Sequence, residues 1–263
     1  MDEEGYVFLT GRIKEQINRG GEKIAPVAID NVLMACPGVE SLFCFAAPHK
    51  ELGEVVAVAM VEKKGHSVTL KQLNKFGLLS GQLAAQWLPF VLVYCDAVPK
   101  GPTGKVQRTK LASMLGVPAL SAADNPRSYR YKAGEPLVEV LTSAQVQSET
   151  SDGKQTLPSK SSFTESLEDV VGLELQHLDT VVVDSFTAVT VSTFLHSHYA
   201  LEVSAKDCLR LSVTRLYATL CLKSLTAAAL CDDVENLLGV ELAGDIHAPL
   251  PMDSFTAVRL ASE

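Results

Sequence analysis

The serine of a repeated hexapeptide is the first candidate for chemistry in this sequence. Asp-Ser-Phe-Thr-Ala-Val occurs at 184–189 and again at 253–258, and an exact repeat of this length is unlikely to arise by chance. In each copy the serine follows an aspartate and opens an amphipathic stretch, which predicts a hydroxyl at a helix N-terminus. Free N–H groups and the helix dipole favour a phosphate there. Ser185 and Ser254 therefore indicate phosphate chemistry, and the alternative for each is a plain helix N-cap.

A lysine on a loop rich in glycine and proline is the second candidate. Residues 99–108 run Pro-Lys-Gly-Pro-Thr-Gly-Lys-Val-Gln-Arg, so Lys105 directly follows a glycine. A cation on such a loop can reach a phosphate or carboxylate oxygen. The spacing differs from that of a P-loop. The alternative is a basic loop that is only solvated.

A glycine pair after a charged amphipathic turn is the third candidate. Residues 11–24 run Gly-Arg-Ile-Lys-Glu-Gln-Ile-Asn-Arg-Gly-Gly-Glu-Lys-Ile. Gly20 and Gly21 permit close approach of the backbone to a ligand. A tight hairpin with solvated charges explains the same residues, and the segment alone does not decide between the two.

Taken together, in this order and at this separation, the two segments resemble the small C-terminal domain of the acyl-adenylate-forming ligases. This family includes acyl-CoA synthetases, peptide-synthetase adenylation domains and luciferases. The resemblance covers residues 5–112 and is greatest to short-chain and oxalate-type acyl-CoA synthetases. Further matching motifs are Gly5-Tyr6, Pro37-Gly38-Val39, Pro48 and Leu52-Gly53-Glu54.

The resemblance implies a role for each site residue. Lys105 would stabilise the transition state of adenylation by offsetting charge on the carboxylate and α-phosphate oxygens. ATP and Mg²⁺ would be substrates of the complete enzyme. The other implied roles are a hinge at Lys14, contact with the nucleotide ribose region at Arg12, and a pantetheine tunnel lined by Gly20, Gly21 and Glu22.

The sequence departs from the family pattern in three ways. Ala28 stands where a glutamate is common and Trp87 where a lysine is usual, and we expect neither to touch the chemistry. The large N-terminal domain, which holds the phosphate-binding loop, the adenine pocket and the acyl pocket, has no counterpart in this sequence. We therefore expect a fragment that does not adenylate an acid alone and that needs this adenylation domain as a partner.

The two serine motifs resemble the Asp-Ser-Leu signature of acyl and peptidyl carrier domains, with Phe in place of Leu. The resemblance implies a four-helix fold in which the serine starts the second helix. Ser185 and Ser254 would then carry 4′-phosphopantetheine as cofactor. The implied partners are a phosphopantetheinyl transferase and downstream synthase domains.

The pattern of apolar residues predicts a multidomain chain. Residues 1–116 are expected to form an α/β domain, a mixed sheet with flanking helices, and 117–160 a flexible linker. Residues 161–226 are expected to form an all-α four-helix carrier bundle, and 233–263 a second carrier domain that is truncated and poorly stable. The expected strands are 6–9, 42–47, 55–61 and 90–94, and the expected helices are 26–35, 69–87, 163–175, 185–196, 205–209 and 212–222.

Composition excludes several classes of protein. No apolar run is long enough to span a bilayer and the N-terminus lacks a signal peptide, so we expect a cytoplasmic protein without a membrane partner. Residues 1–116 carry a net charge of +2, whereas 161–263 carry −10, which argues against nucleic acid and for docking to basic protein surfaces. The six cysteines and six histidines show no metal-ligand spacing, so no metal site is expected.

These inferences favour one function over two alternatives. The favoured one is part of a protein that activates a carboxylic acid with ATP and passes it to pantetheine on a carrier serine, as in the loading modules of polyketide and peptide synthases. The first alternative is an acyl-CoA ligase that uses free CoA, with degenerate carrier repeats. The second is a non-catalytic scaffold that binds partner proteins through its acidic helices.

Overall fold

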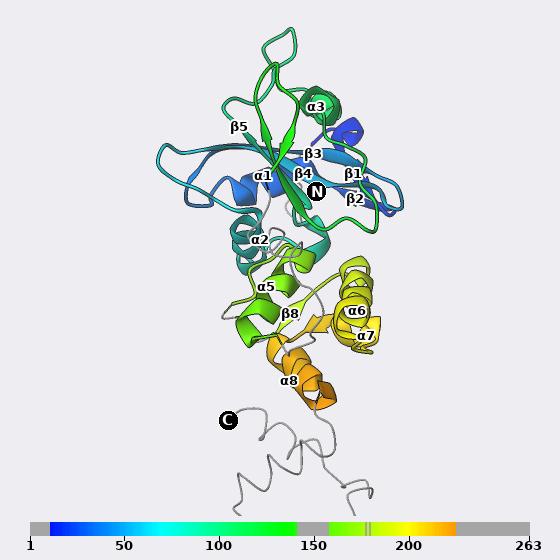
Figure 1. Cartoon of the computed structure of the whole chain (residues 1–263). Helices are drawn as coiled ribbons and strands as arrows, with labels where there is room; N and C mark the ends of the chain where they lie inside the picture. Colours follow the sequence, from blue (N-terminus) through cyan, green and yellow to red (C-terminus); the bar gives the residue numbers. More distant parts are fainter. Residues whose placement is uncertain (1–10, 141–157, 177, 179, 225–263) are drawn as a thin grey trace, which may run out of the picture. The chain divides into compact units, whose positions relative to one another are not determined.

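The computed structural model describes residues 11–140, 158–176, 178 and 180–224 (Figure 1). The chain divides into two compact units, one made of 1–151 with 165–174 and the other of 152–164 with 175–263. The expected strand over 6–9, the second carrier domain expected over 233–263 and Ser254 lie outside the described residues.

The first unit is built on a mixed seven-stranded sheet, which confirms the predicted α/β class. A long antiparallel hairpin forms its centre, and a parallel strand follows it. The strands are β1 (Ile17–Arg19), β2 (Glu22–Ile24), β3 (Val39–His49), β4 (Gly53–Glu62), β5 (Val91–Cys95), β6 (Arg127–Tyr131) and β7 (Val138–Glu139).

Both faces of the sheet are covered by helices, which explains its continuous apolar strands. In β4, Val56, Val58 and Met60 pack into a core with α1 (Pro26–Leu33) and α2 (Leu70–Leu79). The alternate residues Val55, Ala57 and Ala59 pack into a second core with α3 (Arg108–Leu115). Figure 1 shows α1 and α2 on one side of the sheet and α3 on the other.

The helix expected over 69–87 is shorter than predicted. A capping box between Thr69 and Gln72 starts α2, and the helix ends at Leu79. Gly81 follows with φ +69°, a left-handed conformation that ends helices and that glycine adopts without strain. A separate 3₁₀ turn, η2 (Ala85–Trp87), then leads into β5.

Part of the expected linker is structured. β6 pairs in parallel with β5, and β7 pairs with β6, so residues 127–139 extend the sheet. Polar residues dominate β6, and only Tyr129 is buried in its centre, so the strand lacks the apolar run that predicts strands. This pairing provides hydrogen-bond partners for the backbone groups of β5 on the side that faces away from β4.

The helices of residues 160–224 begin and end close to the predicted residues. They are α5 (Lys160–Val171), α6 (Ser185–Tyr199), α7 (Ala205–Cys208) and α8 (Val213–Ser224), with a short strand pair β8 (Val181–Val182) and β9 (Arg210–Leu211). The predicted inward residues Ala188, Val191 and Leu195 of α6 are buried.

The structure does not show residues 161–226 as one four-helix bundle, because this range is divided between the two units. The segment Glu165–Glu174, which includes most of α5, belongs to the first unit. There, Asp169 lies 2.7 Å from the ammonium of Lys71, and Asn74 donates a hydrogen bond to the carbonyl of Gly172 at 2.8 Å. Acidic and backbone groups of this segment thus have partners on α2, which the helical periodicity alone does not reveal.

Two further structural facts bear on the sequence predictions. Among the described residues, no helix is long and apolar enough to cross a membrane. The five described cysteines are free thiols, and four of them are buried.

Candidate functional site

The loop that carries Lys105 is closed on itself. The Gly101 amide donates to the carbonyl of Lys105 at 2.9 Å, and the Gly104 amide donates back to the carbonyl of Gly101 at 2.9 Å. Gly104 has φ +74°, which explains why a glycine precedes the lysine. Lys105 is exposed at the surface of this loop. Its ammonium is therefore available to an incoming anion while its backbone is held.

The base of the loop is fixed by side-chain packing. A Cβ at Gly101 would lie 2.5 Å from the amide nitrogen of Gln107, so the loop folds directly over that side chain. Gln107 is the N-cap residue of α3, and Gly116 ends this helix in a left-handed conformation. The sequence analysis did not predict α3, whose two buried residues are Leu111 and Leu115.

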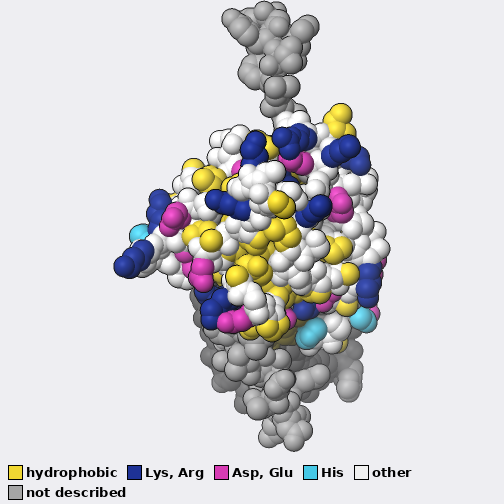
Figure 2. All heavy atoms as spheres, turned by 90° about the horizontal axis from the view of Figure 1, so that it is seen from above, with side chains coloured by type: hydrophobic (Ala, Val, Ile, Leu, Met, Phe, Trp, Pro, Cys, Tyr) yellow, Lys and Arg dark blue, Asp and Glu magenta, His cyan; other side chains and the backbone are white. Residues whose placement is uncertain are grey.

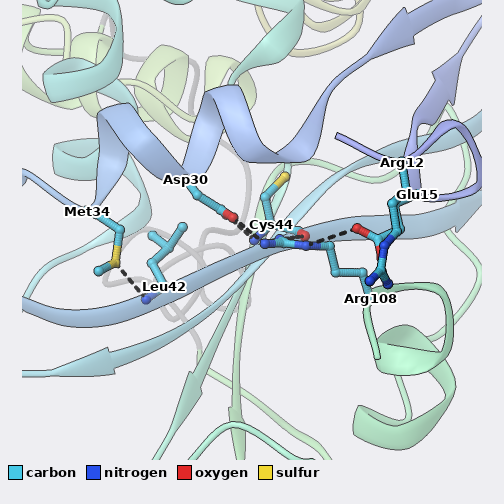
Figure 3. Close-up of polar contacts among 7 residues, drawn as sticks. All are labelled: Arg12, Glu15, Asp30, Met34, Leu42, Cys44 and Arg108. Atoms are coloured by element: carbon cyan, nitrogen blue, oxygen red, sulfur yellow. Dashed lines mark hydrogen bonds and ion pairs between the residues drawn. The ribbon is translucent and has the colours of Figure 1, made fainter. Parts of the chain in front are cut away.

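Arg108, the first residue of α3, ties this helix to the sheet and to α1. Its guanidinium donates to the carbonyl of Cys44 at 2.7 Å and to Asp30 at 2.6 Å. Its Nε lies 3.5 Å from a carboxylate oxygen of Glu15. Figure 3 shows Arg108 between Asp30 and Glu15. The arginine also lies over the Phe43 ring, 5.6 Å from its centroid.

The partner of Arg108 on α1 is a buried carboxylate. Asp30 is 8% exposed and accepts a hydrogen bond from the Cys44 amide at 2.6 Å. Burial raises the pKa of Asp30 above its usual value, and the Arg108 hydrogen bond opposes that rise. Burial also raises the pKa of the Cys44 thiol, so Cys44 is a packed neutral thiol rather than a nucleophile.

The predicted hinge residue lies in a short 3₁₀ turn, η1 (Ile13–Glu15). Lys14 is exposed, and Ile13 beside it is 85% exposed, so little packing restrains this end of the turn. Arg12, the predicted nucleotide contact, is also exposed and forms an ion pair with Glu15 at 3.1 Å. Glu15 thus connects Arg12 with Arg108.

The glycine pair forms the two-residue loop of the β1–β2 hairpin. Arg19 pairs with Glu22, and Gly20 and Gly21 between them have φ +57° and +96°. Positive φ at both loop positions is the geometry that requires glycine in such hairpins. The Gly20 amide donates to the carbonyl of Leu52 at 2.8 Å, which holds the loop against the β3–β4 turn.

Trp87, which we expected not to touch the chemistry, contacts Glu22 at the start of β2, next to this loop. Its indole N–H donates to the Glu22 carboxylate at 2.7 Å, and Gln86 donates to the same oxygen at 3.3 Å. Glu22, predicted to line a pantetheine tunnel, is therefore held from the side by η2.

A groove of about 510 Å³ lies between the turn η1 and α3. Its lining includes Lys14, Glu15, Glu54 and Arg108. The structure thus brings Lys14, the predicted hinge residue, close to the start of α3, whereas Lys105 and the Gly20–Gly21 loop do not line this groove. Figure 2 looks down on the molecule of Figure 1, and hydrophobic side chains gather in the middle of that face among scattered Lys and Arg side chains.

In the second unit, Ser185 is exposed and is the first residue of α6. The N-cap is Asp184, whose carboxylate accepts from the amides of Phe186 and Thr187 at 2.9 and 3.1 Å. The structure therefore assigns the capping role to the aspartate, and the serine stands beside it.

Three residues that hold the site together were missed by the sequence analysis: Glu15, Asp30 and Arg108. Asp30 is the one acidic residue of α1, and it lies among the buried Ile29, Val32 and Leu33. An acid among the core-facing residues of an amphipathic helix is a signal for a buried cationic partner. The sequence does not show which of many cations that partner is.

The matching part of the chain is similar to adenylate-forming ligases that join carboxylic acids to a thiol or to AMP. No protein-family model matches the chain. The oxalate–CoA ligase of Saccharomyces cerevisiae is 42% identical over 112 residues, which are 43% of this chain and 20% of the yeast enzyme. The fatty acid–[acyl-carrier-protein] ligase ScoC of Streptomyces coeruleorubidus is 39% identical over 111 residues, 42% of this chain and 21% of that protein.

A similar solved structure is apo MatB from Rhodopseudomonas palustris, with 35% identity and a TM-score of 0.36. The match covers 40% of this chain and 21% of MatB. The chain thus spans about a fifth of the length of the relatives it matches. The similarity supports the coarse class of acid–thiol ligase for this region.

Proposed function

We propose that residues 11–115 act as the mobile small domain of an adenylate-forming acid–thiol ligase. The observation that carries the proposal is the exposed Lys105 on a loop whose backbone is closed and whose base is anchored by Arg108. In the complete enzyme, the Lys105 ammonium would contact the acyl carboxylate and α-phosphate oxygens as ATP is attacked and pyrophosphate leaves. A cation placed in advance offsets the charge that develops there.

The hinge and the hairpin give this domain two working positions. In one, Lys105 faces the adenylating site. After rotation about Lys14 in η1, the Gly20–Gly21 loop would face the thiol acceptor, and Glu22 would line its path. An exposed turn with little packing suits a hinge, because its φ and ψ can change without breaking a core. Mg²⁺ would neutralise the phosphates of ATP in the complete enzyme.

The acceptor that we favour is a pantetheine thiol carried on this chain. Ser185 is exposed at the N-terminus of a 15-residue helix. In the proposed modification its Oγ attacks the β-phosphate of CoA, loses its proton, and releases adenosine 3′,5′-bisphosphate. The acyl group then passes from AMP to the terminal thiol. Acidic residues of this unit, among them Asp184, Glu202 and Asp207, would attract a basic transferase.

Incubation of the whole chain with a phosphopantetheinyl transferase and CoA tests this acceptor. Intact-mass analysis should show one added arm, which Ser185→Ala removes and Ser254→Ala leaves in place. Modification of Ser254 is expected to be weak. Absence of any mass gain with several transferases would overturn the carrier assignment and favour free CoA or the scaffold alternative.

A chimera tests the ligase assignment independently. The matched residues of this chain would replace those of the yeast oxalate–CoA ligase, with which they share 42% identity. Pyrophosphate exchange measures adenylation, and consumption of supplied acyl-adenylate measures thiol transfer. A folded chimera with neither activity would overturn the proposal.

Free CoA is the second candidate acceptor. The yeast relative is named for CoA and the Streptomyces relative for an acyl carrier protein, so both acceptors occur among similar proteins. Offering the chimera CoA and the pantetheinylated chain side by side distinguishes them by their kcat/KM values.

A further inference from the structure

We propose that Arg108 is a positioning residue that locks the hinge turn η1 and the Lys105 loop into one body. The roles of hinge and catalytic loop rest on the proposed function. We call the contacts of Arg108 with Asp30, Cys44 and Glu15 the lock, and these contacts are a property of this fold.

The lock is visible in the contacts of a single guanidinium. Arg108 reaches Asp30 on α1 at 2.6 Å, the carbonyl of Cys44 on β3 at 2.7 Å, and Glu15 of η1 at 3.5 Å. Glu15 in turn pairs with Arg12 at 3.1 Å (Figure 3). A continuous chain of charges therefore runs from the buried face of α1 to the hinge turn.

The same arginine fixes the base of the catalytic loop. Arg108 follows Gln107, and the Gln107 side chain packs directly under Gly101 at the start of the loop. The Gly101 amide closes the loop on the Lys105 carbonyl. A shift of Arg108 relative to the sheet would consequently move the backbone that carries Lys105.

An arginine is required by geometry rather than by charge. Three acceptors from three different elements lie around one planar group with five fixed N–H donors. A lysine ammonium at the same position has a single nitrogen and cannot reach all three acceptors at these distances. The Arg108→Lys variant would therefore keep the positive charge but lose the connection between the elements.

The buried pair is better suited to orientation than to stability. The side chains of Arg108 and Asp30 are only 15% and 12% exposed, so both charges lose much of their hydration. Burial raises the pKa of Asp30 above its usual value in spite of the hydrogen bond from its cationic partner. A buried ion pair can orient its elements without strengthening the fold.

Amide hydrogen exchange on the whole 263-residue chain tests the lock without any enzymatic assay. The reporters are the hydrogen-bonded amides of Glu15 and Gln16 in η1, and of Gly101 and Gly104 in the loop. Glu15→Ala removes only the hinge side of the network and leaves the buried pair intact. We expect about tenfold faster exchange in η1 and little change in the loop.

Arg108→Lys should instead raise exchange at both places by about tenfold. The double variant should exchange in η1 little faster than Arg108→Lys alone, because the other partner of Glu15, Arg12, is exposed and its ion pair contributes little. Arg130→Lys, which alters an arginine stacked on Tyr94, is the matched control and should change neither reporter.

Two results would overturn the lock. One is additive effects of Glu15→Ala and Arg108→Lys in η1, and the other is unchanged exchange in the loop of Arg108→Lys. If Arg108→Lys also raised exchange in β3 and β4, the variant would be globally destabilised. The Glu15→Ala variant would then test the proposal, and unchanged amide exchange in η1 of that variant would reject it.

The yeast chimera adds a functional arm. Arg108→Lys should lower kcat for pyrophosphate exchange about tenfold with little change in the KM for ATP, since the residue orients Lys105 and does not bind nucleotide. If the chimera is inactive but the exchange pattern holds, the ligase assignment fails and the lock stands. An active chimera in which Arg108→Lys has normal kcat would remove the positioning role.

Discussion

The candidate reactive residues of the two units, Lys105 and Ser185, are positioned by different kinds of contact. In the first, Lys105 depends on a contact between residues 78 positions apart in the sequence, Asp30 and Arg108. In the second, Ser185 depends on its immediate neighbour Asp184, which caps the helix that the serine begins. The first arrangement needs the whole sheet to be folded, and the second needs little more than one helix.

The two ends of the sequence also differ in charge. Residues 1–116 carry 13 Lys and Arg against 11 Asp and Glu, while residues 161–263 carry 5 against 15. Four of these fifteen acids, Glu165, Glu168, Asp169 and Glu174, belong to the first unit, so the contrast is one of sequence regions rather than of the two units. Under the proposed function a cationic loop would act on phosphates and carboxylates, and an acidic region would attract a basic protein partner.

Replacement of Lys105 by alanine should have the largest effect. Removing a cation that acts on developing charge costs about 10²–10³ in rate, so pyrophosphate exchange by the chimera should fall by that factor. Thiol transfer from supplied acyl-adenylate should survive, because under the proposed function the lysine would leave the site for that step. Lys100→Ala, on the same loop, is the matched control. Normal pyrophosphate exchange in Lys105→Ala would refute the catalytic role.

Replacement of Lys14 by proline should separate the two half-reactions. Proline would fix φ in a turn that changes conformation under the proposed function, so one half-reaction should continue while the other falls by at least about tenfold. Stopped-flow measurement of each half-reaction in the chimera checks this. Lys14→Ala, which leaves φ free to change, is the control and should retain both half-reactions. Equal loss of both steps in a folded Lys14→Pro variant would place the pivot elsewhere.

The sequence predicted the parts of the fold that carry long apolar runs. The expected strands at 42–47, 55–61 and 90–94 correspond to β3, β4 and β5, and the helix expected from Pro26 corresponds to α1. The short strands β1 and β2 were missed because three polar-rich residues give no periodic signal. β6 was missed because its stability comes from pairing with β5 rather than from its own side chains.

The site was predicted only where a motif marks it. Lys105 and the glycine pair stand out by type and spacing, and Lys14 was named only through the family resemblance. Asp30 and Arg108 do not, because their pairing depends on how α1 and α3 meet at β3. Trp87 was assigned no role, since nothing in the sequence places η2 beside Glu22. Long-range contacts between single residues are the information that one sequence lacks.

In the second unit, Asp184→Ala should destabilise α6 locally. The carboxylate accepts from two backbone amides, and loss of such a cap costs about 1 kcal/mol. Native-state hydrogen exchange should show this loss in the first turn of α6 and no change in β3 to β5. Asp184→Asn keeps an acceptor oxygen and should retain most of the stability. An effect as large in the sheet as in α6 would contradict the local support inferred for Ser185.

The smallest effect is expected from Trp87→Phe, which tests whether the hairpin is supported by tertiary contact like the Lys105 loop. The change removes an indole N–H bond to Glu22 and keeps an aromatic ring in the same place. Because the bond is exposed, its loss should cost about 0.5 kcal/mol or somewhat more. In the chimera, KM for the thiol acceptor should rise about two- to threefold, and pyrophosphate exchange should be unchanged. Gln86→Ala removes the longer bond to the same carboxylate and should have a weaker effect. If Trp87→Phe slowed pyrophosphate exchange as much as thiol transfer, Trp87 would support the whole domain, and its contact with Glu22 would have no particular bearing on the acceptor.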